Sequence, residues 1–188
     1  MTGRDFFKRF EIFIIVISNF FKIFPYNWRC FFFDLFSSFP SSFGVFIRYC
    51  ILRTLVKSLG RNVYIGRYSI IKNYSNLIIG DNVSIHEFCF IDAIGGIEIG
   101  NNVSIAHSCS LVSFEHIYTS ADYPIKYSGI EKKTININDD VWLGANVKIL
   151  SGSHINSRVV VGAQSLVKGE LLEKSLYLGS PVKRIKSI

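Results

Sequence analysis

The sequence is poor in the residues and patterns that mark several common protein classes. Its 188 residues include only four prolines, four cysteines and one methionine. The cysteines form no CxxC pair and show no metal-ligand spacing, which excludes a zinc ribbon and the disulfide framework of a small secreted domain. No secretory signal with a small-residue cleavage site is present. A reducing, cytoplasmic setting and no bound metal are therefore expected.

Long apolar runs and a basic stripe are also missing. The longest apolar stretch, Phe10 to Phe24, is 15 residues long and contains Glu11, Asn19 and Lys22. A helix that spans a bilayer needs about 20 predominantly apolar residues, so this stretch is a poor transmembrane candidate. The formal net charge is +7, but the excess is not arranged with base-stacking aromatics, and no nucleic-acid motif occurs. Nucleic-acid binding is not predicted.

The chain does contain a hydrophobic residue at every sixth position over more than 100 residues. Two steps of eight and one of twenty-six interrupt the period, and a fixed short period is typical of a solenoid. The repeated positions, called anchors below, are Ile65, Ile71, Ile79, Ile85, Ile91, Ile99, Ile105, Leu111, Ile137, Leu143, Ile149, Ile155, Val161 and Val167. Four positions after most anchors stands a small or apolar residue, such as Ser69, Ser75, Val83, Cys89, Val103, Cys109, Val147 and Ser165.

This period predicts a parallel β-helix over residues 61–175. An amphipathic helix needs apolar residues at i, i+3, i+4 and i+7, and a sandwich has strands every 8–12 residues with variable turns. Gly and Asn recur between the anchors, and both tolerate the left-handed conformation that tight corners need. These corner residues are Gly66, Gly80, Gly100, Gly144, Gly162, Asn82, Asn102 and Asn146. Cys89 and Cys109 occupy small-residue positions, where core packing explains them.

Residues 1–60 have a different composition and predict an amphipathic, apolar helical segment, while residues 176–188 form a tail. Pro25 and Pro40 divide the segment into three stretches. Eight Lys and Arg against three acids give it +5 of the net charge. Basic, aromatic-rich helices suit the plane of a membrane interface, which predicts peripheral contact at the inner face of the membrane. The alternative, compatible with the first, is that the helices cap the open first coil.

The 26-residue gap between Leu111 and Ile137 predicts an inserted loop, residues 114–134, as the place for chemistry. Glu115 falls on a small-residue position, where burying an unpaired carboxylate is costly, so the chain should leave the coil there. His116 then stands at the root of the loop. Histidine exchanges a proton near neutral pH. His86, His107 and His154 occupy regular positions and are weaker candidates.

Five ordered segments resemble the hexapeptide-repeat acetyltransferases. They are Ile99–His107, His116 with the later Asp-Tyr-Pro-Ile of residues 122–125, Asp140–Val147, Val161–Val167, and Gly179–Lys183. The resemblance covers roughly residues 60–186 and is nearest to the galactoside, maltose and surface-polysaccharide O-acetyltransferases. It implies a left-handed parallel β-helix, acetyl-CoA as acyl donor, and a homotrimer with sites between subunits.

The resemblance also implies roles for individual residues. His116 corresponds to the general base, and Trp142 to a tryptophan beside the pantetheine channel of the cofactor. Ala145 and Ala163 correspond to positions whose backbone binds the pantetheine arm. Lys168 and Lys183 correspond to positions near the nucleotide end and the phosphate of the cofactor.

The chain departs from the family pattern at three places. Lys168-Gly169 replaces a Thr-Lys pair, and Ser151–Asn156 replaces a Pro-Gly-Val-Thr-Ile-Gly segment. Glu87-Phe88-Cys89 stands where sugar acetyltransferases carry an asparagine, so the acceptor contacts are not predicted from the family. Asp92 and Glu115 are candidate substrate contacts. Glu115, Asp92, Asp122 or a backbone carbonyl could orient the His116 imidazole.

Together these features predict an acetyl-CoA-dependent O-acetyltransferase that acts on a sugar of a surface polysaccharide or its lipid-linked precursor. The near alternative is N-acetylation of a nucleotide-linked amino sugar. Two alternatives lie in other classes: a catalytically silent solenoid scaffold, and a zinc enzyme using His86, His107 and His116. The spacings of these histidines, 21 and 9 residues, do not match the zinc pattern.

Overall fold

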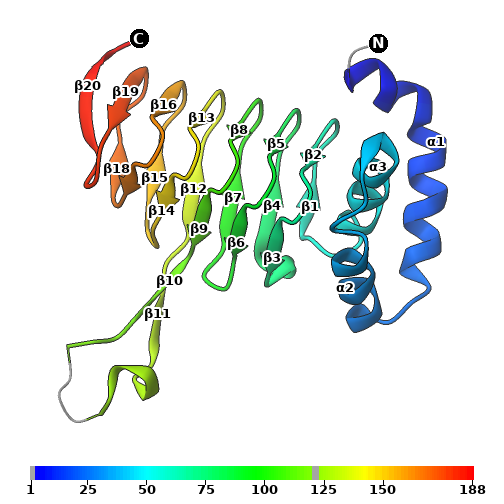
Figure 1. The fold of residues 1–188 in the computed structure, drawn as a ribbon, viewed down its shortest axis with the longest axis horizontal. Helices are drawn as coiled ribbons and strands as arrows, with labels where there is room; N and C mark the ends of the chain where they lie inside the picture. Colours follow the sequence, from blue (N-terminus) through cyan, green and yellow to red (C-terminus); the bar gives the residue numbers. More distant parts are fainter. Residues whose placement is uncertain (1–2, 120–122) are drawn as a thin grey trace.

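The computed structural model describes residues 3–119 and 123–188 as a three-sided parallel β-solenoid with a layer of helices at one end (Figure 1). Successive turns of the chain add short strands to three sheets, A, B and C, which are parallel except for the last strand of sheet B. This confirms the predicted β-helix of hexapeptide repeats with a helical N-terminal segment. The solenoid begins at residue 58 with its first strand.

The strands follow one another around the three faces in chain order. Sheet A contains β1 (Ser58–Leu59), β4 (Leu77–Ile79), β7 (Ile97–Ile99), β12 (Ile135–Ile137), β15 (His154–Ile155) and β18 (Glu170–Leu171). Sheet B contains β2 (Tyr64–Ile65), β5 (Ser84–Ile85), β8 (Ser104–Ile105), β13 (Trp142–Leu143), β16 (Val159–Val161), β19 (Ser175–Leu178) and β20 (Lys183–Ser187). Sheet C contains β3 (Ile70–Lys72), β6 (Phe90–Asp92), β9 (Ser110–Val112), β14 (Lys148–Ile149) and β17 (Leu166–Val167).

The anchors form the core of the solenoid. Ile65 lies in sheet B, Ile71 in sheet C and Ile79 in sheet A, and the later anchors repeat this order. Every anchor has a relative exposure of 3% or less. Because successive coils place an aliphatic side chain above an aliphatic side chain, for example Ile85 above Ile65 in register, the hydrophobic contact is continuous along the axis.

One predicted core position is wrong. Ser75 is exposed, whereas its neighbour Tyr74 and the following Leu77 are buried. The eight-residue step from Ile71 to Ile79 adds a 3-10 turn, η1 (Tyr74–Asn76), at the corner. This turn rotates the tyrosine ring inward, where it packs edge-on against Phe33 at 5.7 Å between ring centroids.

The corner residues have two different physical roles. Asn82, Asn102 and Asn146 have φ of 57°, 58° and 60°, as the left-handed interpretation expects. The glycines do not have a positive φ there, so the expected reason for them is wrong. They permit close approach of successive coils, because a Cβ on Gly144 would lie 2.6 Å from the backbone nitrogen of Ala163.

Three helices are described, α1 (Gly3–Lys22), α2 (Tyr26–Leu35) and α3 (Ser41–Leu52), and they cover the first coil (Figure 1). Pro25 and Pro40 are the N-caps of α2 and α3, which confirms the division into three stretches. In the described residues, no helix combines the length and the apolar character needed to cross a membrane.

The helical layer is joined to the solenoid by Arg48, whose buried guanidinium bonds to backbone carbonyls. Its guanidinium donates to the carbonyl of Ile65 in the first coil at 3.0 Å and to the carbonyls of Phe36 and Phe39 at 3.2 and 2.9 Å. Burial lowers the pKa of Arg48. The helices therefore cap the solenoid through specific contacts, as the capping interpretation requires.

Candidate functional site

The inserted loop leaves the solenoid after β9 as an antiparallel hairpin. Strands β10 (Phe114–His116) and β11 (Ile130–Lys132) pair with His116 opposite Ile130, and η2 (Ile125–Tyr127) lies beyond them. The hairpin extends away from the coils (Figure 1). A groove of about 670 Å³ runs along it, lined by Glu115, His116, Ile117, Tyr118, Thr119, Ile130, Glu131 and Lys132.

His116 lies on this groove with its side chain exposed. Its ring meets the Phe114 ring edge-on, with 6.1 Å between centroids. Since successive side chains of a strand point to opposite faces, Phe114 and His116 share one face of the hairpin and Glu115 lies on the other. The exposed imidazole has the access to solvent and ligand that a general base needs.

Glu115 is paired with Lys168, which stands at the end of β17 two coils further on. The Lys168 ammonium lies 3.0 Å from each carboxylate oxygen of Glu115. The hydrogen bond to this carboxylate, and then its charge, raise the pKa of Lys168. The pair ties the hairpin root to the solenoid. The roles expected of Glu115 toward substrate and of Lys168 toward the nucleotide remain predictions.

Asp92 has its own partners at the corner that follows β6. Its carboxylate accepts a hydrogen bond from the Asn73 side chain at 2.6 Å and from the backbone N–H of Ile94 at 3.2 Å. Both bonds go to the same carboxylate oxygen, Oδ1, and both partners lie in the first coils. Asp122, the other acidic candidate, lies outside the described residues.

Three of the residues expected at the cofactor lie along one corner of the solenoid, between sheets B and C. Ala145 follows β13 and Ala163 follows β16, and the backbone N–H after Ala163 donates to the Ala145 carbonyl at 2.8 Å. One coil further, the turn after β19 forms backbone hydrogen bonds with Leu166 and leads to Lys183. These small side chains and the exposed lysine leave the corner open to an extended ligand.

Trp142 lies on the outer surface of sheet B, and its indole is 54% exposed. Ser104 and Val160 are its neighbours in register on the adjacent strands. Trp142 thus precedes the Ala145 corner by three residues. Sheet C separates this corner from the corner that carries Lys168, Glu115 and His116.

The remaining histidines occupy ordinary positions on the coils. His154 contacts the Asn156 side-chain oxygen at 3.1 Å, and His86 lies 3.8 Å from the Glu87 carboxylate. Within residues 3–119 and 123–188, no group of three or more His, Cys, Asp or Glu side chains is placed to hold a metal ion.

The sequence indicated Phe88 only as part of the Glu87-Phe88-Cys89 departure from the family pattern, and neither Tyr68 nor the pairing of Tyr68 with Phe88 was predicted. Both residues lie in the corner between sheets B and C, on the first two coils, and their exposed rings stack. The sequence does contain a signal for them. They stand 20 residues apart, which is the length of one coil in this part of the repeat, and the same position on the next coil carries Ser108.

Comparison with known proteins agrees with this geometry. No family model matches the chain. A probable acetyltransferase of Mycobacterium tuberculosis is 33% identical over 128 residues, which are 68% of this chain and 36% of that protein. The putative lipopolysaccharide biosynthesis O-acetyl transferase WbbJ of Escherichia coli is 40% identical over 76 residues, 39% of each chain. The matches thus span under two fifths of these relatives' lengths.

Solved structures match over most of the chain. A maltose O-acetyltransferase from Clostridium difficile superposes with a TM-score of 0.76 at 25% identity, covering 87% of this chain and 86% of that one. A hexapeptide-repeat acetyltransferase from Vibrio cholerae, complexed with acetyl coenzyme A, gives 0.62 at 25% identity and 82% of both chains. The chain is a relative of the hexapeptide-repeat acetyltransferases.

Among these acetyltransferases and their structural neighbours, the acyl acceptor varies. An N-acyltransferase from Bacillus cereus, solved with dTDP and coenzyme A, superposes with a TM-score of 0.56 at 25% identity, over 70% of this chain and 84% of that one. The shared fold therefore does not determine whether the acceptor atom is oxygen or nitrogen.

Proposed function

We propose that the protein is an acetyl-CoA-dependent O-acetyltransferase that acts on a sugar hydroxyl of a surface polysaccharide or its lipid-linked precursor. The observation that carries the proposal is the exposed His116 imidazole at the root of the hairpin. The likeness to O-acetyltransferases in sequence and fold supports it.

Acetyl-CoA would lie along the corner between sheets B and C. The small side chains of Ala145 and Ala163 leave room for the pantetheine arm, and their backbone groups provide hydrogen-bonding partners. The Trp142 indole would border the arm, and Lys183 would pair with a phosphate at the far end. Lys168 is paired with Glu115 on the opposite edge of sheet C, so it would reach the nucleotide end only from a neighbouring subunit and only if it left Glu115.

In the reaction, the acceptor hydroxyl attacks the thioester carbonyl while His116 removes the hydroxyl proton. The tetrahedral oxyanion would be stabilised by backbone N–H donors. Collapse of this intermediate forms the acetyl ester, and the sulfur leaves as CoA thiolate and takes up a proton. Transfer is direct, because the nearest cysteine along the chain, Cys109, is fully buried with its thiol bonded to the Gly144 carbonyl.

The active assembly would be a homotrimer with sites between subunits. In one chain, His116 and the Ala145–Ala163 corner lie on opposite edges of sheet C. A neighbouring chain that contributes its hairpin to this corner would bring the base to the thioester. This separation is the structural support for an intersubunit site.

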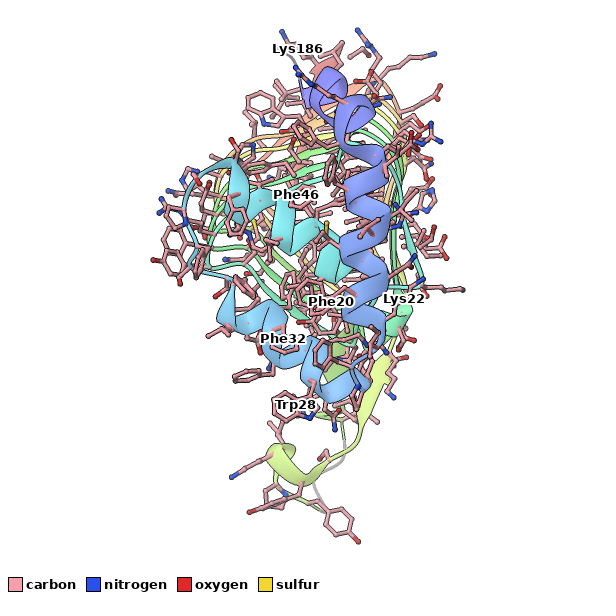
Figure 2. All side chains as sticks on the ribbon, turned by 90° about the vertical axis from the view of Figure 1, so that its right-hand side faces the viewer. Phe20, Lys22, Trp28, Phe32, Phe46 and Lys186 are labelled. Atoms are coloured by element: carbon pink, nitrogen blue, oxygen red, sulfur yellow. The ribbon has the colours of Figure 1, made fainter. Side chains whose placement is uncertain are left out.

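The helical layer would hold the enzyme at the inner face of the membrane. Ile14, Ser18 and Phe21 are buried on the inward side of α1, which packs against α3, while Ile12 on α1 and Ile23 just after it are 75% and 77% exposed. A helix that faces water normally has a polar outer side. Figure 2 shows α1 and α2 on this end, with Phe20, Lys22 and Trp28 at the surface. The +5 charge of residues 1–60 favours anionic lipid over a second copy of the same basic surface.

N-acylation of a nucleotide-linked amino sugar is the second candidate, supported by the likeness to the Bacillus cereus N-acyltransferase. An amine acceptor needs the same proton removal by His116. Turnover of a soluble nucleotide amino sugar at a far higher rate than any glycan would favour this candidate.

The test of the activity measures CoA thiol release from acetyl-CoA with a pool of free and lipid-linked glycans. His116→Ala should lower acceptor-dependent release by about 10²-fold or more, as expected for loss of a general base. His154→Ala, a histidine on sheet A, is the matched control and should leave the rate unchanged. Equal rates for His116→Ala and the wild type would remove His116 from the mechanism.

The membrane contact is tested with vesicles of phosphatidylcholine and phosphatidylserine. Ile12→Asn with Ile23→Asn changes only exposed side chains and should weaken cosedimentation by about tenfold, since each side chain loses apolar burial in the interface. Ile70→Asn, an exposed isoleucine on sheet C, is the control. Unchanged cosedimentation of the Ile12→Asn, Ile23→Asn double variant would exclude this face.

A further inference from the structure

The corner between sheets B and C contains one left-handed residue on each of five coils. These residues are Tyr68, Phe88, Ser108, Asn146 and Gln164, with φ between 59° and 61°. Backbone hydrogen bonds connect each coil to the next, from the Phe88 N–H to the Arg67 carbonyl and from the Ser108 N–H to the Glu87 carbonyl. The five positions form one column parallel to the solenoid axis.

Aromatic residues are unexpected in this column. The left-handed region is sparsely populated by residues other than glycine and is enriched in asparagine. Ser108 and Asn146 show that a small polar side chain satisfies the same corner. The fold therefore does not need the rings of Tyr68 and Phe88, and a strained conformation that the fold does not require points to function.

The two rings form a stacked, solvent-exposed surface. Their centroids are 5.3 Å apart and their planes differ by 14°. Tyr68 is 45% exposed and Phe88 is 60% exposed. Ser108 follows Phe88 in the column with a short side chain, so the ring face of Phe88 that is turned away from Tyr68 is not covered by an aromatic neighbour from that coil.

Charged and polar groups border the pair. The Arg67 guanidinium lies 6.0 Å from the centroid of the Tyr68 ring. The Glu87 carboxylate accepts a hydrogen bond from the Tyr64 hydroxyl at 2.7 Å through one oxygen, its other oxygen lies 3.8 Å from the His86 ring, and the side chain is 31% exposed. An apolar surface with a few fixed polar groups is typical of a small-molecule site.

We propose that Tyr68 and Phe88 form the acceptor subsite, on which the C–H face of a pyranose ring stacks while Glu87 accepts a hydrogen bond from a ring hydroxyl. A pyranose combines a flat apolar face with hydroxyls at its rim, and this matches a flat ring surface bordered by a carboxylate and a guanidinium. The subsite rests on the proposed function, because Ala145 and Ala163 continue the same corner on later coils. Donor and acceptor then lie end to end along one edge, with the reacting groups between them near Ser108.

The test uses Phe88→Asn, because asparagine is the residue that the same corner carries at position 146. Binding of methyl β-D-galactopyranoside, methyl β-D-glucopyranoside and methyl α-L-rhamnopyranoside is followed by saturation transfer from the protein to the C–H protons of the sugar, with CoA present. Wild type should bind at least one of them, and Phe88→Asn should raise its Kd by about tenfold. Phe88→Trp restores a ring and should bind as wild type does. Phe90→Asn, one residue beyond the corner region on sheet C, is the control.

The outcomes separate this subsite from the proposed function. A parallel CoA titration should give the same Kd for wild type and Phe88→Asn, since the substitution lies outside the donor half of the corner. Absence of CoA binding in wild type would count against the transferase, while ring-dependent glycoside binding would still support the subsite. If no glycoside binds wild type, or if Phe88→Asn binds as tightly as Phe88→Trp, the subsite is overturned.

Discussion

At the residue scale, the side chains that matter most for stability and for chemistry have opposite surroundings. Arg48 is the largest of the fully buried side chains in the described residues, and its guanidinium donates hydrogen bonds to backbone carbonyls. His116 is exposed at the hairpin root. The buried cation positions the helical layer, whereas the exposed base is free to meet an acceptor.

Arg48→Met should destabilise the protein by about 2–4 kcal/mol, because it removes the charged donor to the Phe39 carbonyl and leaves the buried Ile65 carbonyl without this partner. Urea unfolding at pH 7 measures this change. Arg61→Met is the matched control, since its side chain is 81% exposed and its ion pair with Glu11 is 3.6 Å long; it should cost less than about 1 kcal/mol. Equal losses for the two variants would contradict the role of Arg48.

The sequence contains the residue pattern but not the partners of individual residues. The resemblance placed Lys168 at the nucleotide end of the cofactor, yet the fold brings its ammonium to Glu115 from 53 positions earlier in the chain. Asp92 likewise pairs with Asn73. Such contacts depend on which coils stack, and a single-residue motif carries no information about the neighbouring coil.

At the element scale, each coil is stabilised by side chains that bond to the next coil. The Asn62 amide donates to Asn82, and Asn82 donates to Asn102, at 3.0 and 3.1 Å. Tyr64 of β2 reaches Glu87 in the corner of the following coil. These contacts add to the backbone ladders, whose strands are only two or three residues long in most coils.

Tyr64→Phe should reduce the free energy of unfolding by about 1 kcal/mol at pH 7, through loss of a hydrogen bond to a carboxylate. The Tyr64 hydroxyl is the largest cause of the lowered pKa of Glu87. A carboxyl with a lowered folded-state pKa contributes stability above its unfolded value, and this contribution is lost as the pH falls through the folded value.

The difference in free energy of unfolding between wild type and Tyr64→Phe should therefore be largest at neutral pH. It should become smaller below about pH 4, since carboxyls of unfolded chains titrate near pH 4.3. Urea unfolding from pH 7 to pH 3 measures it. Tyr127→Phe, an exposed tyrosine of the hairpin, should follow wild type at every pH. A difference that grows in acid would contradict the assignment.

At the scale of the whole molecule, the solenoid separates three tasks in space. The helical layer covers one end, the hairpin leaves the middle, and β19 with β20 forms the other end (Figure 1). The corner between sheets B and C runs along the coils from the aromatic pair to Lys183, while His116 stands beyond the opposite edge of sheet C.

Trimers assembled from a mixture of two inactive variants should regain activity. His116→Ala removes the base, and Ala145→Trp fills the corner expected to hold the pantetheine arm. Random mixing of the two chains in a trimer should recover about a quarter of the sites, because an interface between subunits combines the intact residue of each. Acetyl transfer after co-refolding measures it, with each variant refolded alone as control. No recovery would place the complete site within one chain.

The sequence alone determined the solenoid, the three helical stretches and the position of the hairpin. These features follow from local rules: a buried aliphatic side chain every six residues, prolines at helix starts, and a gap in the period. The sequence also indicated His116, because the residue after a broken repeat is necessarily near the loop root.

The tertiary structure alone decided which residues meet. It assigned the corner glycines to the close approach of coils, gave Lys168 to Glu115, buried Arg48 among carbonyls, and stacked Phe88 on Tyr68. The physical reason is common to all of them. A side chain in a solenoid contacts the coil above and the coil below, 14 or more residues away in this chain, and those contacts form only when the coils have stacked in register.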